Sequence, residues 1–373
     1  MLDSTPTEPS LASSAELPPS STPPSSPPPN EPGPREPRPT LRLLVSAGLV
    51  VILWGLGFLI ESQLIEYVQR ILLLCGVNIV LAVGLNLING TTGQFSIGHA
   101  GFMAVGAYTA AYLGVHLAPA LEAALGAGVG TDALVLNLAL LGGALLAGFA
   151  GLLIGMPSLR LRGDYLAVVT LGFGEIIRIL FTNAEFLGSA TGYFGDSLAG
   201  LRAYSSFFWV YLWVLLVVVG IRNLTFSQTG RSLVAIREDE IAAESIAAPS
   251  TRLKVQAFVI SAATAGIAGG LFAHMQAGIR PEDFRFEKSI DMLVMIIVGG
   301  LGSISGAIIG GVFVAVTLEL MRDLAQYRLV VYALLLIIVM IGRPKGLLGS
   351  RELSELWRRA PGKTPEPVRG GKS

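Results

Sequence analysis

Residues 229–254, TGRSLVAIREDEIAAESIAAPSTRLK, form a polar segment between two apolar stretches of the chain. Its core, residues 231–248, contains no Gly or Pro, and it is rich in Ala, Arg and Glu, which are strong helix formers. Pro249 provides a natural end, because proline does not continue a helix. A charged helix held outside the bilayer between two spans predicts a docking surface for a soluble partner. It does not suggest a self-sufficient enzyme.

The composition is that of a polytopic α-helical membrane protein. Of the 373 residues, 52% are hydrophobic and 14% are charged, and the mean hydropathy is +0.64. Soluble domains carry about 25% charged residues. A membrane β-barrel would show alternating segments of about ten residues, whereas long apolar runs recur here. The formal net charge of zero argues against a general role in binding nucleic acid.

Ten apolar segments are candidate spans, because each crossing needs about 20 apolar residues. The block at 290–321 is interrupted by Gly299, Gly300, Gly302 and Gly306, which fits either one kinked helix or two crossings. The ten segments are 43–60, 71–89, 99–117, 133–156, 165–181, 207–221, 255–275, 290–301, 304–321 and 328–342. Before and after them we expect a disordered tail at 1–40, which holds 13 of the 21 prolines and lacks the apolar core of a signal peptide, and a polar tail at 351–373.

Positive charges indicate how the chain is oriented, since Lys and Arg concentrate in short cytoplasmic loops. The groups before the first span, between the fourth and fifth, and between the sixth and seventh fit a path that starts in the cytoplasm. The last group is cytoplasmic only if 255–342 crosses an even number of times. We therefore expect ten spans with both termini inside. The groups are Arg35, Arg38 and Arg42; Arg160 and Arg162; Arg222, Arg231, Arg237, Arg252 and Lys254; and Arg343, Lys345 and Arg351.

Residues 84–102, GLNLINGTTGQFSIGHAGF, concentrate uncharged polar side chains where one span ends and the next begins. Such side chains at a glycine-broken helix end can line a path for a small polar solute. A polar turn at the membrane face explains them equally well. The side chains are Asn86, Asn89, Gln94, Ser96 and His99. The motif SIGHA at 96–100 resembles SISGA at 303–307, which leaves open a relation between two halves of the chain.

Glu175 and Arg178 are i, i+3 neighbours inside an apolar segment. Ionisable residues within a span are functional candidates because they are costly there. Glu175 is thus a candidate for the translocation path, although a mutual ion pair is the favoured interpretation. No Ser/His/Asp, Cys/His or paired-carboxylate set stands out in the sequence.

Metal and nucleotide sites are not predicted. Cys75 is the single cysteine, and His99, His116 and His274 lie too far apart for metal-ligand spacing. The Walker A pattern is absent, since Trp357 occupies the first glycine position before Gly362-Lys363-Thr364. If ATP is used, another subunit binds it.

Three long stretches, 84–108, 159–180 and 230–302, and the ending RPKGLLG at 343–349 resemble the permease subunits of branched-chain amino acid ABC transporters. The likeness is to the longer, M-type member of the permease pair and covers roughly residues 70–350. It implies a fold of about ten transmembrane helices over 41–350, including glycine-broken helices. It also implies an importer in the bacterial inner membrane, surrounded by lipid. The partners would be a second permease, two ATP-binding subunits and an extracytoplasmic binding protein. The chain itself would need no cofactor.

The resemblance assigns residues 222–254 as a coupling loop that contacts the ATP-binding subunits and transmits their closure to the spans. Ala247 stands where the family often has glycine, so we expect the turn after the core to differ slightly from the family's usual geometry. The side chains expected to dock are Arg231, Arg237, Glu238, Asp239, Glu240 and Glu244.

Other functions remain open from the sequence. The same family also serves urea, short amides and other amino acids. A secondary transporter or channel would need a membrane-buried titratable relay, for which Glu175 is the candidate. A membrane enzyme would need a catalytic set.

Overall fold

The computed structural model describes residues 39–159, 161, 163–193, 206–245, 248–276, 278–322, 327–343, 346–347 and 349. The tail predicted at 1–40, apart from its last two residues, and the tail at 351–373 lie outside the described residues. So do Arg160, Arg162 and Ala247.

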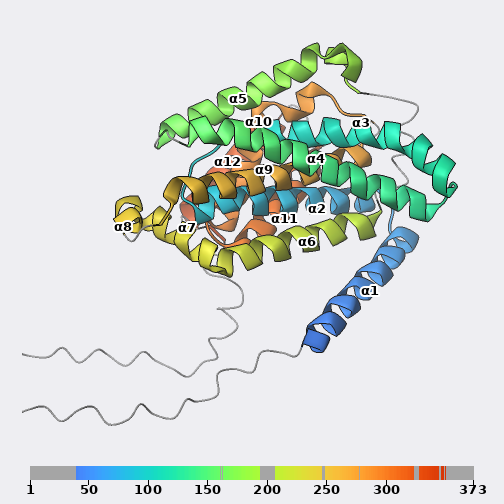
Figure 1. Cartoon of the computed structure of the whole chain (residues 1–373), viewed down its shortest axis with the longest axis horizontal. Coiled ribbons are helices and arrows are strands. Elements are labelled where there is room, and N and C mark those ends of the chain that lie inside the picture. Colours follow the sequence, from blue (N-terminus) through green and yellow to red (C-terminus); the bar gives the residue numbers. More distant parts are fainter. Residues whose placement is uncertain are drawn as a thin grey trace, which may run out of the picture. The chain divides into compact units, whose positions relative to one another are not determined.

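The described residues are mostly helical (Figure 1). A π-helix, η1 (Leu87–Thr91), continues the second helix, and a short 3₁₀ turn, η6 (Pro281–Phe284), precedes the tenth. The α-helices are α1 (Pro39–Gln63), α2 (Glu66–Asn86), α3 (His99–Leu125), α4 (Val129–Ser158), α5 (Asp164–Asn183), α6 (Phe207–Phe226), α7 (Gln228–Glu238), α8 (Glu240–Ser245), α9 (Ser250–Met275), α10 (Phe286–Gly299), α11 (Ile304–Leu320) and α12 (Arg328–Gly342).

Each predicted span coincides with a helix, but the number of crossings remains a prediction. Within the described part of the chain, six helices are long and apolar enough to cross a membrane: α2 with η1, α3, α4, α5, α6 and α9. Residues 51–60 of α1 and all of α11 form shorter apolar helices. The all-helical architecture agrees with a polytopic membrane protein.

The glycine-rich block at 290–321 forms two helices, as expected. Gly300 and Gly302 adopt φ angles of 118° and 85°, which side chains rarely allow. A Cβ on Gly300 would also lie 2.3 Å from the carbonyl oxygen of Gly349. At 1.5 Å per residue, α10 and α11 are about 21 and 26 Å long, which is shorter than a hydrocarbon core of about 30 Å. The two helices pack against each other, and the number of times that this block crosses the membrane stays a prediction.

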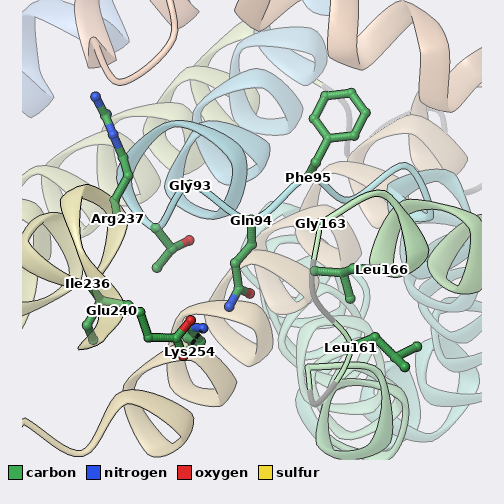
Figure 2. Close-up of a pocket in the computed structure, with 11 residues that line it drawn as sticks. Gly93, Gln94, Phe95, Leu161, Gly163, Leu166, Ile236, Arg237, Glu240 and Lys254 are labelled. Atoms are coloured by element: carbon green, nitrogen blue, oxygen red, sulfur yellow. Dashed lines mark hydrogen bonds and ion pairs between the residues drawn. The ribbon is translucent and has the colours of Figure 1, made fainter. Parts of the chain in front are cut away.

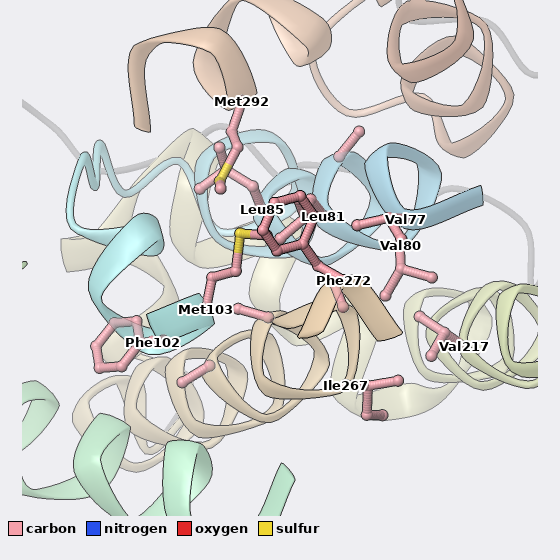
Figure 3. Packing of buried hydrophobic residues seen from close by; sticks show 14 of the residues in the cluster. Val77, Val80, Leu81, Leu85, Phe102, Met103, Val217, Ile267, Phe272 and Met292 are labelled. Carbon is pink, nitrogen blue, oxygen red and sulfur yellow. The ribbon is translucent and has the colours of Figure 1, made fainter. Parts of the chain in front are cut away.

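The helices α3, α4 and α9 pack side by side through small residues (Figure 1). A Cβ on Gly106 of α3 would lie only 2.2 Å from Cα of Gly266 in α9. Gly143 of α4 faces the carbonyl oxygen of Gly106. Close backbone approach of this kind is typical of membrane helices, where lipid supplies little hydrophobic drive for association. Figure 3 shows the neighbouring apolar core, in which side chains of α3, α9 and α10 surround Leu81 and Leu85 of α2.

One end of the bundle collects several connections. The α2–α3 loop, the α4–α5 loop, α7 and α8, and the start of α9 line a common pocket. Arg237 of α7 contacts the carbonyl oxygen of Gly90 and approaches the α10–α11 turn at Gly302. The chain after α12 reaches this turn as well, where the amide of Leu347 donates to the carbonyl of Val298 at 2.7 Å. This arrangement places the polar segment where it can contact several helix ends at once.

Candidate functional site

The polar segment folds into two helices, α7 and α8, and not into the single helix expected over 231–248. The helix is interrupted at Asp239, whose backbone is extended (φ −154°, ψ 109°). Asp239 Oδ1 accepts hydrogen bonds from the amides of Ile241 at 2.9 Å and Ala242 at 3.0 Å, so it caps α8. Aspartate is neutral to unfavourable inside helices and favoured at N-caps. That preference was the available signal for the break.

Arg237 forms contacts with other parts of the same chain. Its Nη1 donates to the carbonyl oxygen of Gly90 in η1 at 2.6 Å. Its stem passes close to Gly93, where a Cβ would lie 2.6 Å from Arg237 Cγ. A Cβ on Gly302 would lie 3.1 Å from Nη1. In Figure 2 the guanidinium points away from the centre of the pocket. Arg237 thus joins α7 to the end of α2 and to the α10–α11 turn.

Two of the acidic side chains also have intramolecular contacts. Lys254 Nζ lies 2.6 Å from Glu240 Oε1, and the two side chains are only 12% and 29% exposed. The hydroxyl of Ser250 donates to the carboxylate of Glu244. Both contacts join α8 to the start of α9. These carboxylates therefore fix the geometry of the polar segment in addition to any external role.

The outward face of α7 and α8 is partly apolar. Glu238 is exposed, with 69% of its side chain accessible, and Arg231 is also exposed. Val234, which lies between Arg231 and Glu238 in the sequence, is 39% exposed. Ile241, which follows Glu238, is 70% exposed. Sequence reasoning counted the charges and missed these two residues. The signal was present: Ile241 precedes Ala243, the buried residue of α8, by two positions and so falls on another face.

The helix break at the end of α2, where α2 passes into η1 and the loop to α3, is stabilised by two asparagines about one helical turn apart. Asn86 accepts from the amide of Gly302 at 2.9 Å and donates to the carbonyl of Ser303 at 3.2 Å. Asn89 donates to the carbonyl of Ser96 at 3.2 Å and accepts from its amide at 3.3 Å. The similar motifs at 96–100 and 303–307 are therefore each attached to the end of α2 by an asparagine side chain, and a relation between two halves of the chain stays a prediction.

Ser96 and His99 are buried near the end of α2, whereas Glu175 and Gln94 lie elsewhere. His99 is 1% exposed, and neither ring nitrogen has a hydrogen-bond partner among the described residues. The same holds for the hydroxyl of Ser96. His99 faces α2, since its Nε2 lies 3.7 Å from a Cβ placed on Gly84. Buried polar atoms without partners are rare in proteins, which makes His99 and Ser96 unusual among the buried polar residues here.

Glu175 lies on a different side of α3. It forms the expected ion pair with Arg178, at 2.7 Å between Oε2 and Nε. Together with Gly101 and Ser289 it lines a small cavity of about 10 Å³. His99 and Gly101 are two positions apart and so point to opposite faces of α3. The fifth candidate, Gln94, lines the pocket beside α7 and α8 (Figure 2).

Comparison with known proteins gives a consistent result. The family described as "Branched-chain amino acid transport system / permease component" matches residues 67–341. The chain is 41% identical over 300 residues to the high-affinity branched-chain amino acid transport system permease protein LivM of Salmonella typhimurium, covering 72% of this chain and 67% of the relative. It is 39% identical to LivM of Escherichia coli K12 over the same shares.

A second type of relative matches over a shorter region. The permease protein LivH of Salmonella typhimurium is 30% identical over 179 residues, which is 48% of this chain and 56% of the relative. No solved structure matches the chain.

Proposed function

Because the chain belongs to the branched-chain amino acid transport permease family, we propose that it is the permease subunit of an ATP-driven importer of branched-chain amino acids. An extracytoplasmic binding protein delivers the solute, and separate subunits bind and hydrolyse ATP. The transported class rests on the names of the relatives, LivM and LivH. The observation that carries the ATP-driven mechanism is the attachment of α7 to the helix break through Arg237.

A second permease is proposed as the immediate partner. The chain resembles both LivM and LivH, and the resemblance to two permease types supports a heterodimer. Helix α5 supports a protein contact on its outer face, because few of its residues are buried and it carries the partly exposed pair Glu175–Arg178. Charged groups facing lipid are costly. A second subunit or an aqueous path against α5 would remove that cost.

The proposed orientation puts α7 and α8 in the cytoplasm. The segment 222–254 is rich in Arg and Lys, as expected for a cytoplasmic loop. The chain after α12 lies at the same end, which supports a cytoplasmic C-terminus. A secondary transporter is less well supported, because Glu175, its candidate relay, is already paired with Arg178.

The coupling contact is proposed to centre on the apolar and charged outer face of α7 and α8. Ile241 and Val234 are the exposed apolar residues there, and desolvated apolar anchors commonly contribute most of the energy of an interface. Arg231 and Glu238 flank them. The four other predicted residues act mainly on the shape of the segment: Arg237, Asp239, Glu240 and Glu244.

Replacing Ile241 with glutamate is expected to reduce recovery of the ATP-binding subunits with the tagged chain by about tenfold or more, as for an interface hot spot. The measurement is a pull-down from mild-detergent membranes. Ile65→Glu is the matched control, since Ile65 is 77% exposed between α1 and α2 and the substitution is the same. Recovery of ATP-binding subunits should be unchanged in the control.

Three outcomes decide the proposal. Failure to recover any ATP-binding subunit with the wild-type chain refutes the ATP-driven mechanism. Equal recovery of the ATP-binding subunits with Ile241→Glu and wild type would show that the contact does not lie at Ile241 of α8. Uptake of urea or an amide in place of leucine, in vesicles that contain the full transporter, would leave the family assignment unchanged. It would refute branched-chain amino acids as the transported solute.

A further inference from the structure

A pocket of about 310 Å³ lies between the helices α7 and α8 and the loops that connect α2 to α3 and α4 to α5 (Figure 2). Its lining is divided by chemistry. Gln94, Glu240 and Lys254 form a polar wall, and Leu161 and Leu166 lie across from it. The pocket therefore offers charge and hydrocarbon on opposite sides.

Gln94 is the feature that points to a ligand. Gln94 is 9% exposed as a whole residue, and its backbone amide donates to the carbonyl of Ile88 at 3.1 Å. Figure 2 shows the side-chain amide directed into the pocket, towards Glu240 and Lys254. The side-chain amide carries two N–H donors and an oxygen acceptor, and these face the pocket. A polar ligand in the pocket can use both kinds of group.

The ion pair beside Gln94 retains hydrogen-bonding capacity. One oxygen of Glu240 contacts Lys254 Nζ at 2.6 Å, and the other carboxylate oxygen is available to accept. The Lys254 ammonium has three donors, of which this contact uses one. A ligand with adjacent positive and negative groups can thus bind without breaking the pair. Free anions or cations would match only half of this wall.

We propose that this pocket binds a zwitterionic α-amino acid with an apolar side chain. Its carboxylate would accept from Lys254 and Gln94, and its ammonium group would donate to Glu240. Its side chain would contact Leu161 and Leu166. That the amino acid is the transported one, present on the release side, rests on the proposed function.

Occupancy of the pocket has a mechanical consequence. Glu240 belongs to α8, whereas Gln94 and Leu166 belong to a membrane loop and to α5. A bound amino acid bridges these elements and favours the arrangement in which they are close. Accumulated amino acid on this side would therefore slow the movement of α8 and reduce uptake.

Protection of an introduced thiol tests the site. Leu161 is 41% exposed, whereas the native Cys75 is 3% exposed, so a maleimide should label Leu161→Cys selectively. In vesicles that contain the complete transporter, L-leucine, L-isoleucine and L-valine on the α7 side are expected to slow this labelling. Leucinamide and 4-methylpentanoate each lack one of the two charges and should not. Ser245→Cys, on the exposed side of α8, is the control whose labelling should not change.

Adding Gln94→Leu to Leu161→Cys is expected to raise the leucine concentration for half-protection about tenfold, the loss typical of a hydrogen bond to a charged group. Unchanged labelling of Leu161→Cys at saturating leucine, in vesicles that still take up leucine, overturns the site. Equal protection by leucinamide and leucine overturns the zwitterionic ligand. Loss of leucine uptake by the wild-type transporter would instead refute the proposed function.

Discussion

Replacement of Arg237 by methionine is expected to lower leucine uptake by about tenfold or more while the ATP-binding subunits remain bound. Methionine keeps a long stem against Gly93 but removes the guanidinium that bonds to the carbonyl of Gly90 at 2.6 Å. A hydrogen bond from a charged donor contributes about 1.5–3 kcal/mol, of which partial exposure at this site leaves only a part. The larger consequence is mechanical, because the link between α7 and the break after α2 is lost.

Among the described residues, the side-chain hydrogen bond that joins α7 to η1 is the one from Arg237 to Gly90. Arg237 contacts the carbonyl of Gly90 and lies beside Gly302, and Asn86 ties the Gly302 turn back to α2. A displacement of α7 would therefore act on two helix ends that are joined by a hydrogen bond. Without the guanidinium, α7 can shift while the helix break stays in place. Closure of the ATP-binding subunits would then consume ATP without opening the path.

Three measurements on Arg237→Met separate coupling from docking: pull-down of the ATP-binding subunits, ATP hydrolysis, and leucine uptake in vesicles. The expected pattern is normal recovery, continued hydrolysis and reduced uptake. Arg252→Met is the control, because Arg252 is an exposed arginine in the first turn of α9. Loss of the ATP-binding subunits with Arg237→Met would show that this arginine docks them directly, as the sequence pattern alone suggested.

The contrast between Arg237 and Ile241 shows what the sequence could predict here. Apolar runs of sufficient length located the helices, because burial in a bilayer imposes a strong and continuous signal. Charge and helix propensity located the polar segment. Neither signal reveals which face of α7 turns inward. The acceptor for Arg237 lies 147 positions earlier in the chain, so its role depended on tertiary structure.

The candidate path shows the same limit. The sequence brought Asn86, Ser96 and His99 together because they are close along the chain, and the structure does place them around one helix break. Glu175 was added for its chemistry alone and faces another side of α3. The i, i+3 spacing predicted its pairing with Arg178, since local geometry suffices for that contact. Long-range convergence has no comparable local rule.

The chain holds 45 glycines, and their number does not show which of them allow two helices to pack closely. Gly106 and Gly220 both lie inside helices. A Cβ on Gly106 would meet the backbone of Gly266 at 2.2 Å, whereas a Cβ on Gly220 would meet nothing within 4 Å. The difference depends on the crossing of α3 and α9, which no local pattern encodes.

Gly106→Ala is accordingly expected to destabilise the protein strongly. The obstructing atoms are the Cα, carbonyl carbon and carbonyl oxygen of Gly266, so no side chain can rotate away. The helices α3 and α9 must separate, and α4 is affected because Gly143 also packs against Gly106. Overpacking of this kind costs about 1–3 kcal/mol and occasionally more. The intrinsic gain from replacing glycine by alanine in a helix is about 1 kcal/mol and is too small to offset a shift of three helices.

Thermal unfolding in detergent, followed by the loss of the monodisperse species, measures the effect. Gly106→Ala should lower the midpoint by about 2–5 °C, because overpacking costs about 1–3 kcal/mol and each kcal/mol lowers the midpoint of a long chain by about 2 °C. Gly220→Ala should leave it unchanged or raise it, because the position is open and helical. Equal midpoints for the two variants would mean that α3 and α9 are farther apart than the structure has them. Since α3 begins at His99 and α9 contributes Lys254 to the pocket, a wider crossing would also displace the helix break from the coupling helices.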